Sequence, residues 1–543
     1  MKPLKVILVQ PPIQDFYLTK KRTIPYGLAA IAACIKQKGF DVDILDALST
    51  DKSKTIDYPE AFSYLEPFYG KKDISFFSLF HEFKHFGYSY EHIGTKIRAE
   101  KPFVVGISSL FTAYCSEAIK TAQTVKKFHP ECKIVLGGHH PTIFPEKVLE
   151  CRAVDYVLRG EGETCMAQLC EALRDGSALE QIPGIAFKKK TAVHISPPSW
   201  IPDFDGLPLP CFELINHNFY QRKNRGSISV VSSRGCPMQC SYCSVSATSS
   251  HAPFRQRKVE DVIKEIKMQT RNHDIGFIDF EDENLCLDKQ WFVRLFSQIN
   301  PLVEGKNIEL RAMNGLFPPA VDEEIVSLMK TAGFKALNLS LGSTSKAQLK
   351  KFKRRDVRAS FETALVLAQK YGLECVSYII AAAPGQTAAS SLEDLLYLAQ
   401  KRTLIGLSIY YPAPGSLDYQ VCQDNKILPK SFALMRSTAL PFNDTTSRLQ
   451  AVTLLRLSRI INFMKHLVDT TGSIPEPKAF SQEKIPLSSD RLSLSKELLQ
   501  WFLEDGKIRG VSSIGEIYTH YTDKTLTLEC IERIKTIEIT GVK

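Results

Sequence analysis

Three cysteines in one short stretch, Cys236, Cys240 and Cys243, constrain the fold of this chain more than any other feature. They have the spacing C-x3-C-x2-C and follow an apolar segment that reads as a buried strand. Three thiolates on one tight loop can hold three irons of a [4Fe–4S] cluster and leave the fourth iron open to a small molecule. A zinc site would normally add a fourth ligand at close spacing, which neither His251 nor Cys286 provides. The spacing therefore predicts an iron–sulfur site with an open coordination position.

Short apolar strands and helical segments alternate along the region that contains these cysteines. Such an alternation predicts parallel strands joined by helical crossovers. Six strand–helix units are expected between residues 225 and 435, and these would form an open, partial (β/α)6 TIM-like barrel rather than a closed barrel of about eight units. The strands are expected at residues 227–233, 276–281, 308–312, 336–341, 375–380 and 404–410.

A second alternation occupies residues 1–175 and predicts an α/β domain with a doubly wound, Rossmann-like sheet. Within it, residues 50–95 form an insertion rich in aromatic side chains, which we expect to pack as a cap rather than to line an apolar pocket. The strands of this domain are expected at residues 5–9, 42–45, 103–108, 133–136 and 155–158.

Two further regions complete the chain. Residues 176–224 contain six prolines, which interrupt regular structure and predict a linker. Residues 436–543 are expected to form a small, mostly helical C-terminal domain that opens with a long amphipathic helix over 445–468.

The net charge and the pattern of cysteines indicate which classes of protein the sequence fits. The 69 basic and 59 acidic side chains give a modest net charge of +10. The densest basic runs, 188–190 and 350–355, are expected to be solvated faces rather than a nucleic-acid site. No stretch approaches the ~18 apolar residues of a membrane-spanning helix. The cysteines outside the triad are scattered singly, which is typical of a reduced, cytoplasmic protein.

The sequence Cys-Pro-Met-Gln-Cys-Ser-Tyr-Cys over residues 236–243 resembles the cluster loop of the radical S-adenosylmethionine (radical SAM) enzymes. In that family the open iron chelates the amino and carboxylate groups of SAM. An electron from the cluster then cleaves SAM to methionine and a 5′-deoxyadenosyl radical. The resemblance implies that Tyr242 lies beside the cluster as a flat packing group.

Two loops of the first domain resemble the S-x-L and G-G elements of cobalamin-binding domains. They follow the third and fourth predicted strands, and ligands of open α/β sheets bind at such carboxyl ends. The Asp-x-His-x-x-Gly loop of that family is missing, as it is in many cobalamin-dependent radical SAM enzymes. The stretches 25–28 and 159–163 also match this subfamily. The resemblance implies cobalamin contacts from Ser108, Ser109, Leu110, Thr112, Gly137, Gly138 and His139; for His139 we expect a loop or hydrogen-bonding role rather than cobalt ligation.

Polar residues follow the predicted barrel strands, where parallel barrels place their chemistry. Relatives usually have a SAM-binding Glu where Thr344 stands, so the neighbouring serines are expected to supply part of that contact. Tyr410 and Tyr411 are candidates to quench or relay a radical, although such residues more often pack. The resemblance implies SAM contacts from Glu281, Asp282, Glu283, Asn314, Ser343 and Ser345.

The resemblance as a whole implies a cobalamin-dependent radical SAM enzyme, most simply a methyltransferase that acts on an unactivated carbon. One SAM would methylate cobalamin and a second would generate the radical. Cyclisation, oxidation or rearrangement without methyl transfer is the alternative within the enzyme class, and a non-catalytic iron–sulfur and corrinoid binding protein is the alternative outside it. The implied partners are a small-molecule, lipid or peptide substrate and a reductant such as flavodoxin or ferredoxin.

Overall fold

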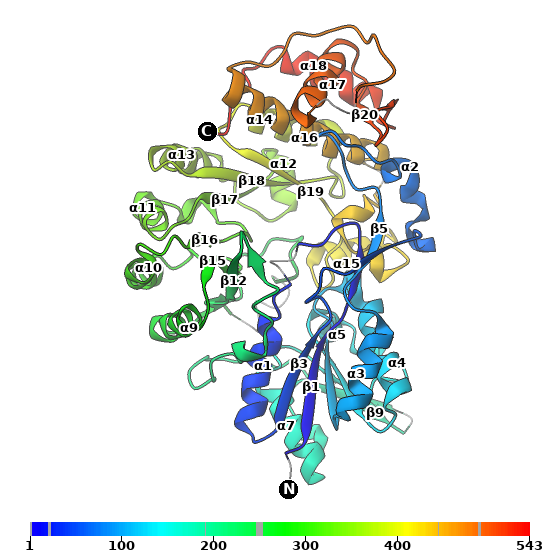
Figure 1. Ribbon diagram of the computed structural model, residues 1–543, viewed down its shortest axis with the longest axis vertical. Coiled ribbons are helices and arrows are strands. Elements are labelled where there is room, and N and C mark those ends of the chain that lie inside the picture. The colour runs from blue at the N-terminus through cyan, green and yellow to red at the C-terminus, as the bar shows by residue number, and fades with distance from the viewer. Residues whose placement is uncertain (1–2, 20–22, 191, 246–252, 444, 487–489) are drawn as a thin grey trace.

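The computed structural model describes residues 3–19, 23–190, 192–245, 253–443, 445–486 and 490–543 (Figure 1). The first domain is built on a seven-stranded sheet of order β10-β9-β8-β7-β6-β1-β3. The five consecutive strands from β8 to β3 in this order are parallel. Helices cover both faces of the sheet, as expected for a doubly wound fold (Figure 1). The parallel strands are β1 (Lys5–Gln10), β3 (Asp41–Asp46), β6 (Val104–Ser108), β7 (Lys133–Gly137) and β8 (Tyr156–Leu158), and the helices are α1 (Tyr26–Gln37), α3 (Tyr90–Glu100), α4 (Cys115–Phe128), α5 (His139–Ile143), α6 (Pro145–Leu149) and α7 (Glu163–Asp175).

The segment expected as a linker contributes to this sheet. β9 (Ile185–Lys189) and β10 (Ala192–Ile195) form a hairpin, and β9 pairs antiparallel with β8. The first three residues of β9 are buried, which gives this strand, between β8 and the edge strand β10, an apolar contact with the domain core. The prolines therefore correctly indicate irregular structure only in the later part of 176–224. A short strand, β11 (Gln221–Arg222), lies at the end of that part.

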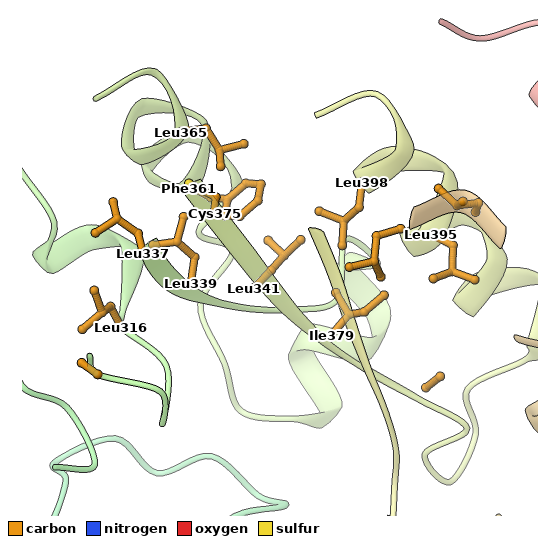
Figure 2. Close-up of a cluster of buried hydrophobic side chains, with 14 of the residues drawn as sticks. Leu316, Leu337, Leu339, Leu341, Phe361, Leu365, Cys375, Ile379, Leu395 and Leu398 are labelled. Atoms are coloured by element: carbon orange, nitrogen blue, oxygen red, sulfur yellow. The ribbon is translucent and has the colours of Figure 1, made fainter. Parts of the chain in front are cut away.

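The second domain is the expected open barrel of six parallel strands, which confirms the predicted fold class. Its strands pair in chain order as two sheets, and backbone bridges between residues 310 and 334 and between 316 and 339 join them. Figure 2 shows Leu337 and Leu339 facing Phe361 and Leu365, so apolar side chains fill the space between strand and crossover helix. The strands are β12 (Arg225–Val230), β15 (Ile275–Phe280), β16 (Glu309–Arg311), β17 (Ala336–Gly342), β18 (Glu374–Ala381) and β19 (Leu404–Ile409); the helices are α9 (Val259–Asn272), α10 (Lys289–Val303), α11 (Glu323–Thr331), α12 (Lys346–Lys351), α13 (Arg358–Lys370), α14 (Ala388–Ala399) and α15 (Leu417–Asp424).

The aromatic insertion packs against the C-terminal region, and both share one apolar core with the barrel. The buried guanidinium of Arg456 donates to the carbonyl oxygens of Phe77 and Phe68, each at 3.2 Å. The insertion, which was expected to pack as a cap, therefore contributes to the hydrophobic core that it shares with the barrel and the C-terminal region. The insertion contains β4 (Ser53–Ile56), α2 (Glu66–Tyr69) and β5 (Phe83–Phe86), which pairs with β2 (Ile13–Asp15); the C-terminal region contains α16 (Arg448–Thr471), α17 (Arg491–Asp505), β20 (Arg509–Val511), β21 (Ile517–Thr519) and α18 (Lys524–Ile534).

Within the described ranges, no helix combines the length and the apolar character needed to cross a bilayer.

Candidate active site between the two domains

The three cysteines lie on a loop that leaves β12 at the carboxyl end of the barrel. Two short strands close the base of this loop, because β13 (Ser233–Arg234) pairs antiparallel with β14 (Arg255–Gln256). The thiols of Cys236, Cys240 and Cys243 are half-buried. Burial raises the pKa of Cys236, and the nearby thiols of Cys243 and Cys240 raise it further. Three neighbouring thiols on one loop are the donor set that a [4Fe–4S] cluster with one open iron uses.

The thiols are not arranged around a single ion. Among the residues outside the gaps, no group of three or more Cys, His, Asp or Glu is placed to hold one metal ion. Part of the loop, residues 246–252 with His251, lies outside the described residues.

Asp282 anchors the turn that starts the cysteine loop. Its carboxylate accepts hydrogen bonds from Ser232 Oγ at 2.7 Å and Ser233 Oγ at 2.5 Å. The side chain is buried, and this burial raises its pKa. Asp282, which was expected to contact SAM, therefore lies inside the protein, and two serines donate hydrogen bonds to its carboxylate.

Glu281, Glu283 and Asn314 lie at the carboxyl ends of β15 and β16. Asn314 is exposed, and its Nδ2 lies 3.4 Å from Glu281 Oε2 and 3.3 Å from the Asp282 carbonyl oxygen. Glu283 is also exposed, yet partial desolvation by the protein around it raises its pKa to about 7. These side chains, rather than Asp282, are therefore available to bind the ammonium group of a SAM molecule held at the cysteine loop.

The serines after β17 are engaged within the barrel. Ser343 is buried and donates to Asp394 Oδ2 at 2.8 Å, and the Thr344 backbone amide donates to Asp394 Oδ1 at 2.6 Å. Ser345 caps α12 by accepting from the Gln348 backbone amide at 3.3 Å. Asp394 on α14 thus organises the loop that in relatives carries the SAM-binding Glu.

The three tyrosines proposed from the sequence occupy different environments. Tyr242 stacks edge-on against Phe352, with ring centroids 4.8 Å apart, and accepts a hydrogen bond from Arg354 at 2.9 Å. Tyr410 is 7% exposed, and its hydroxyl lies 3.7 Å from the sulfur of Cys422. Tyr411 is 37% exposed and lies close enough to Cys243 for the thiol to affect its pKa, which burial raises. Tyr411 is the more exposed of the pair proposed as catalytic, whereas Tyr410 shares an apolar cluster with Phe352, against which Tyr242 of the cysteine loop packs.

The two loops expected at cobalamin hydrogen bond to each other. The Ser109 amide donates to the Gly137 carbonyl at 2.8 Å, and the His140 amide donates to the Ser109 carbonyl at 3.2 Å. A Cβ on Gly138, which has a φ of 116°, would lie 2.8 Å from the Ser109 carbonyl group. Only glycine fits this close approach.

Side chains on these loops suit a flat ligand with polar edges. Ser109 is buried, and its hydroxyl has no hydrogen-bond partner among the described residues. Leu110 and Phe111, in contrast, are 55% and 58% exposed. A buried hydroxyl without a partner next to two exposed apolar groups fits a corrin with its nucleotide base, which would satisfy the first and cover the second. Ser108 lies half-buried at the end of β6, and a Cβ on Gly137 would lie 3.8 Å from the Leu158 carbonyl oxygen, an ordinary contact distance.

His139 and His140 have different roles. His139 Nε2 lies 3.3 Å from the carbonyl oxygen of Pro414, in the loop after β19, so it links the first domain to the barrel. His140 is buried, and its Nδ1 lies 3.3 Å from Thr112 Oγ1. Burial lowers the pKa of both rings, that of His140 to about 4. Both contacts agree with the expected hydrogen-bonding role.

Two glutamates of the first domain hold the base of the cysteine loop. Arg255 donates to both oxygens of Glu161, at 2.9 and 3.0 Å, and Arg234 donates to Glu163 Oε1 at 2.5 Å. Both guanidinium groups lie over the ring of Phe204, at 5.0 Å for Arg234 and 5.3 Å for Arg255. We call this group the acidic clamp. The carboxylates are nearly buried, with 11% and 6% of the side chain exposed, so the pairs are only weakly screened by solvent.

Tyr26 makes a second contact between the domains. Its hydroxyl lies 3.3 Å from Glu265 Oε2 on α9 and 3.1 Å from Arg257 Nη1. Arg257 also donates to Glu265 at 2.6 Å, and Glu265 is completely buried. The stretches 25–28 and 159–163, noticed in the sequence only as family matches, therefore both dock the first domain onto the barrel. Basic residues on each side of the cysteines, together with the paired glutamates in the first domain, are a sequence signal that could have indicated this contact.

A third contact comes from the segment after the barrel. Arg436 lies 3.0 Å from Asp15 Oδ2 and donates to the carbonyl oxygen of Ala113 at 2.7 Å. The Tyr114 hydroxyl donates to the same Asp15 oxygen at 2.5 Å. The cobalamin loops and the cysteine loop are thus fixed relative to each other from several sides.

Comparison with known proteins agrees with both halves of this site. A model of the B12-binding domain matches residues 80–170, and a model of the radical SAM superfamily matches residues 230–398. A curated relative, an uncharacterized methyltransferase of Pyrococcus horikoshii, is 26% identical over 79% of this chain and 85% of its own. An anaerobic magnesium-protoporphyrin IX monomethyl ester cyclase of Rubrivivax gelatinosus is 27% identical over 62% of this chain and 61% of its own.

A solved structure shares the fold across both domains. It is the radical S-adenosylmethionine methyltransferase TsrM from Kitasatospora setae with cobalamin and a [4Fe–4S] cluster bound, which superimposes with a TM-score of 0.63 at 16% identity. The match covers 84% of this chain and 91% of that one. This chain therefore combines a B12-binding domain with a radical SAM domain, the architecture that the sequence predicts.

Proposed function

We propose that this enzyme is a cobalamin-dependent radical SAM methyltransferase that transfers a methyl group to an unactivated carbon. The observation that carries the proposal is the direct contact of the cobalamin loops with the barrel, where His139 meets the carbonyl oxygen of Pro414. This contact places the ligand-binding ends of the two domains face to face. Two of the three relatives described above are named as methyltransferases, which supports the choice of reaction.

The chain's own residues bind and orient the reactants. When bound, the cluster and cobalamin supply the reducing electron and the methyl group. Cys236, Cys240 and Cys243 would hold the cluster, and Glu281 or Glu283 would pair with the ammonium group of SAM. Tyr411, exposed beside Cys243, would form part of the wall against which the substrate carbon lies. The substrate is proposed to be a small molecule, a lipid or a peptide.

Radical chemistry without methyl transfer is the second candidate. The Rubrivivax gelatinosus relative is named as a cyclase, and its match spans 62% of this chain. The two functions share the cluster, SAM and the barrel, and they differ in what happens to the substrate radical. The product mass separates them, because methyl transfer adds a methylene unit whereas ring formation or oxidation removes hydrogen atoms.

The test begins with anaerobic purification from cells supplied with cobalamin, followed by reconstitution with iron and sulfide. We expect about one corrinoid and one cluster per chain, and 5′-deoxyadenosine after reduction in the presence of SAM. SAM labelled with a deuterated methyl group, incubated with small-molecule and lipid extracts, should then yield a product that carries the label. A triple Cys236→Ala, Cys240→Ala, Cys243→Ala variant is the control. An intact cluster without any bound corrinoid would overturn the proposal.

A further inference from the structure

The basic run that follows β17 lies next to the cysteine loop. Six of the ten residues from 346 to 355 are Lys or Arg, and no carboxylate interrupts them. We use the name basic rim for the exposed members Lys346, Lys350, Lys351, Lys353 and Arg355. In the described part of the chain, no carboxylate forms an ion pair with Lys350, Lys353 or Arg355. A run of positive charges that no carboxylate interrupts creates an attractive field for an acidic partner.

The backbone of the basic rim contacts Ser241, the residue that directly follows Cys240. Ser241, which follows Cys240, donates from its amide to the Phe352 carbonyl at 3.0 Å and from its hydroxyl to the Lys351 carbonyl at 3.0 Å. The ring of Phe352 also packs against Tyr242, which precedes Cys243. The backbone that carries the basic rim therefore touches the cysteine loop through hydrogen bonds and an aromatic contact.

Exposed apolar side chains lie next to the basic rim. Leu417 and Val421 on α15 are each 48% exposed. The helix is tied to the same loop, because the Asp418 amide donates to the Ser241 carbonyl at 2.9 Å. Lys353 is near enough to Asp418 to lower the pKa of that carboxyl, although burial raises it more strongly. Apolar side chains beside a ring of charge are the usual composition of a transient protein interface.

We propose that the basic rim and the exposed face of α15 form the docking surface for a small acidic electron-carrier protein of the flavodoxin class. The inference rests on the proposed radical SAM function, which needs a reductant at the cysteine loop. In the transfer, the anionic flavin hydroquinone loses one electron and becomes the neutral semiquinone, and the oxidised cluster gains that electron. The second basic run, residues 188–190, begins on β9 in the first domain, which lies well apart from α12 in Figure 1, and takes no part.

The test compares two charge reversals on the full-length protein. The variant Lys350→Glu, Lys353→Glu, Arg355→Glu changes the basic rim and leaves Lys351 and Arg354, which make local hydrogen bonds, in place. The matched control is Lys188→Glu, Lys190→Glu. Binding of oxidised flavodoxin is followed by calorimetry, and reduction of the reconstituted cluster by flavodoxin hydroquinone is followed by its absorbance. At low ionic strength we expect the rim variant to associate at least about tenfold more slowly, and we expect this difference to shrink as salt is added.

Two further measurements separate docking from folding. Titanium(III) citrate, a small reductant, should reduce the cluster of the rim variant as fast as that of the wild type. Leu417→Ser, Val421→Ser should weaken flavodoxin binding while keeping its salt dependence. Equal flavodoxin binding by the rim variant and wild type, an equal loss in the control, or binding of anionic vesicles or RNA in place of flavodoxin would overturn the docking surface. If flavodoxin reduces the cluster but no methylated product forms, the docking surface stands and the proposed function falls.

Discussion

Glu161 in the first domain and Arg255 at the base of the cysteine loop form a bidentate ion pair, with Arg255 Nη1 2.9 Å from Glu161 Oε2 and Nη2 3.0 Å from Oε1. The Ile201 amide donates to the same carboxylate at 2.7 Å. A nearly buried carboxylate with this set of donors fixes the direction in which the loop leaves the barrel. The first domain therefore helps to shape the cluster site in addition to binding its own ligand.

The first prediction concerns this pair. Glu161→Gln removes the charge and keeps the shape, which leaves Arg255 without its counterion and Arg234 with Glu163 alone. Breaking one partner of a buried pair costs about 3 kcal/mol, so the Tm should fall by several degrees and the iron content after reconstitution should decrease. The control is Glu180→Gln, because the Glu180–Lys189 pair is exposed, with 40% and 49% of the side chains accessible. That variant should unfold at nearly the wild-type temperature, because solvent screens an exposed pair. Equal effects of both variants would contradict a special role of the acidic clamp.

The second prediction concerns the close approach at Gly138. Gly138→Ala places a Cβ 2.8 Å from the Ser109 carbonyl group on a backbone with positive φ, so both cobalamin loops must move. We expect the cobalamin content to fall strongly while the iron content stays near that of wild type. Gly27→Ala on α1, where a Cβ meets no atom within 4 Å, is the control and should bind cobalamin normally. In Gly137→Ala the nearest atom would be 3.8 Å away, so the loop should fold and any loss of cobalamin would report direct contact with the ligand.

The third prediction is a pH dependence of stability from His140. Burial lowers its pKa in the folded chain from 6.5 to about 4, with a further contribution from His139. Between these pH values the unfolded chain binds a proton and the folded chain does not, so stability falls as the pH drops from about 6.5 to 4. The loss at pH 4 amounts to at most about 3 kcal/mol. His140→Gln should flatten the curve of Tm against pH in this window, whereas His466→Gln, on the exposed side of α16, should retain the wild-type curve. Identical curves for wild type and His140→Gln would refute this assignment.

The fourth prediction distinguishes the two tyrosines after β19. Tyr410→Phe removes a hydroxyl whose partner is the Cys422 sulfur at 3.7 Å, and product formation should change by less than about twofold. Tyr411→Ala removes an exposed ring beside the cysteine loop, so product formation should fall more than SAM cleavage does. The measurement is the ratio of methylated product to 5′-deoxyadenosine in each variant. An unchanged ratio in Tyr411→Ala would exclude this side chain from the substrate site.

The sequence predicts the repeating parts of this molecule well. Both strand–helix alternations are confirmed, because alternation of apolar strands and amphipathic helices follows directly from burial on two faces of a parallel sheet. The cysteine loop is also where the sequence places it, at the end of β12. Long-range pairing is harder to predict. The strand β9 has only three buried residues. Nothing in the sequence around them indicates that they pair with β8 and extend the sheet of the first domain.

Side-chain roles at the strand ends depend on partners far away in the sequence. Asp282 and Ser343 have the residue types that the SAM-site prediction required, yet Asp282 accepts from Ser232 and Ser233, and Ser343 donates to Asp394. A single sequence does not show whether a polar side chain at such a position faces the ligand or supports the loop. The residues that remain accessible, Glu283 and Asn314, become evident only from the fold.

The packing of the insertion on the C-terminal region restricts how such enzymes can diversify by recombination. Val511 donates its amide to Asp73 at 3.2 Å, and Arg456 holds two carbonyl groups of the insertion, although hundreds of residues separate these partners. A chimera that took its cobalamin-binding half from one homologue and its C-terminal tail from another would join two halves of a core with mismatched side chains. Exchange between lineages is therefore expected to preserve the two segments as a matched pair, together with the barrel side chains that share their apolar core.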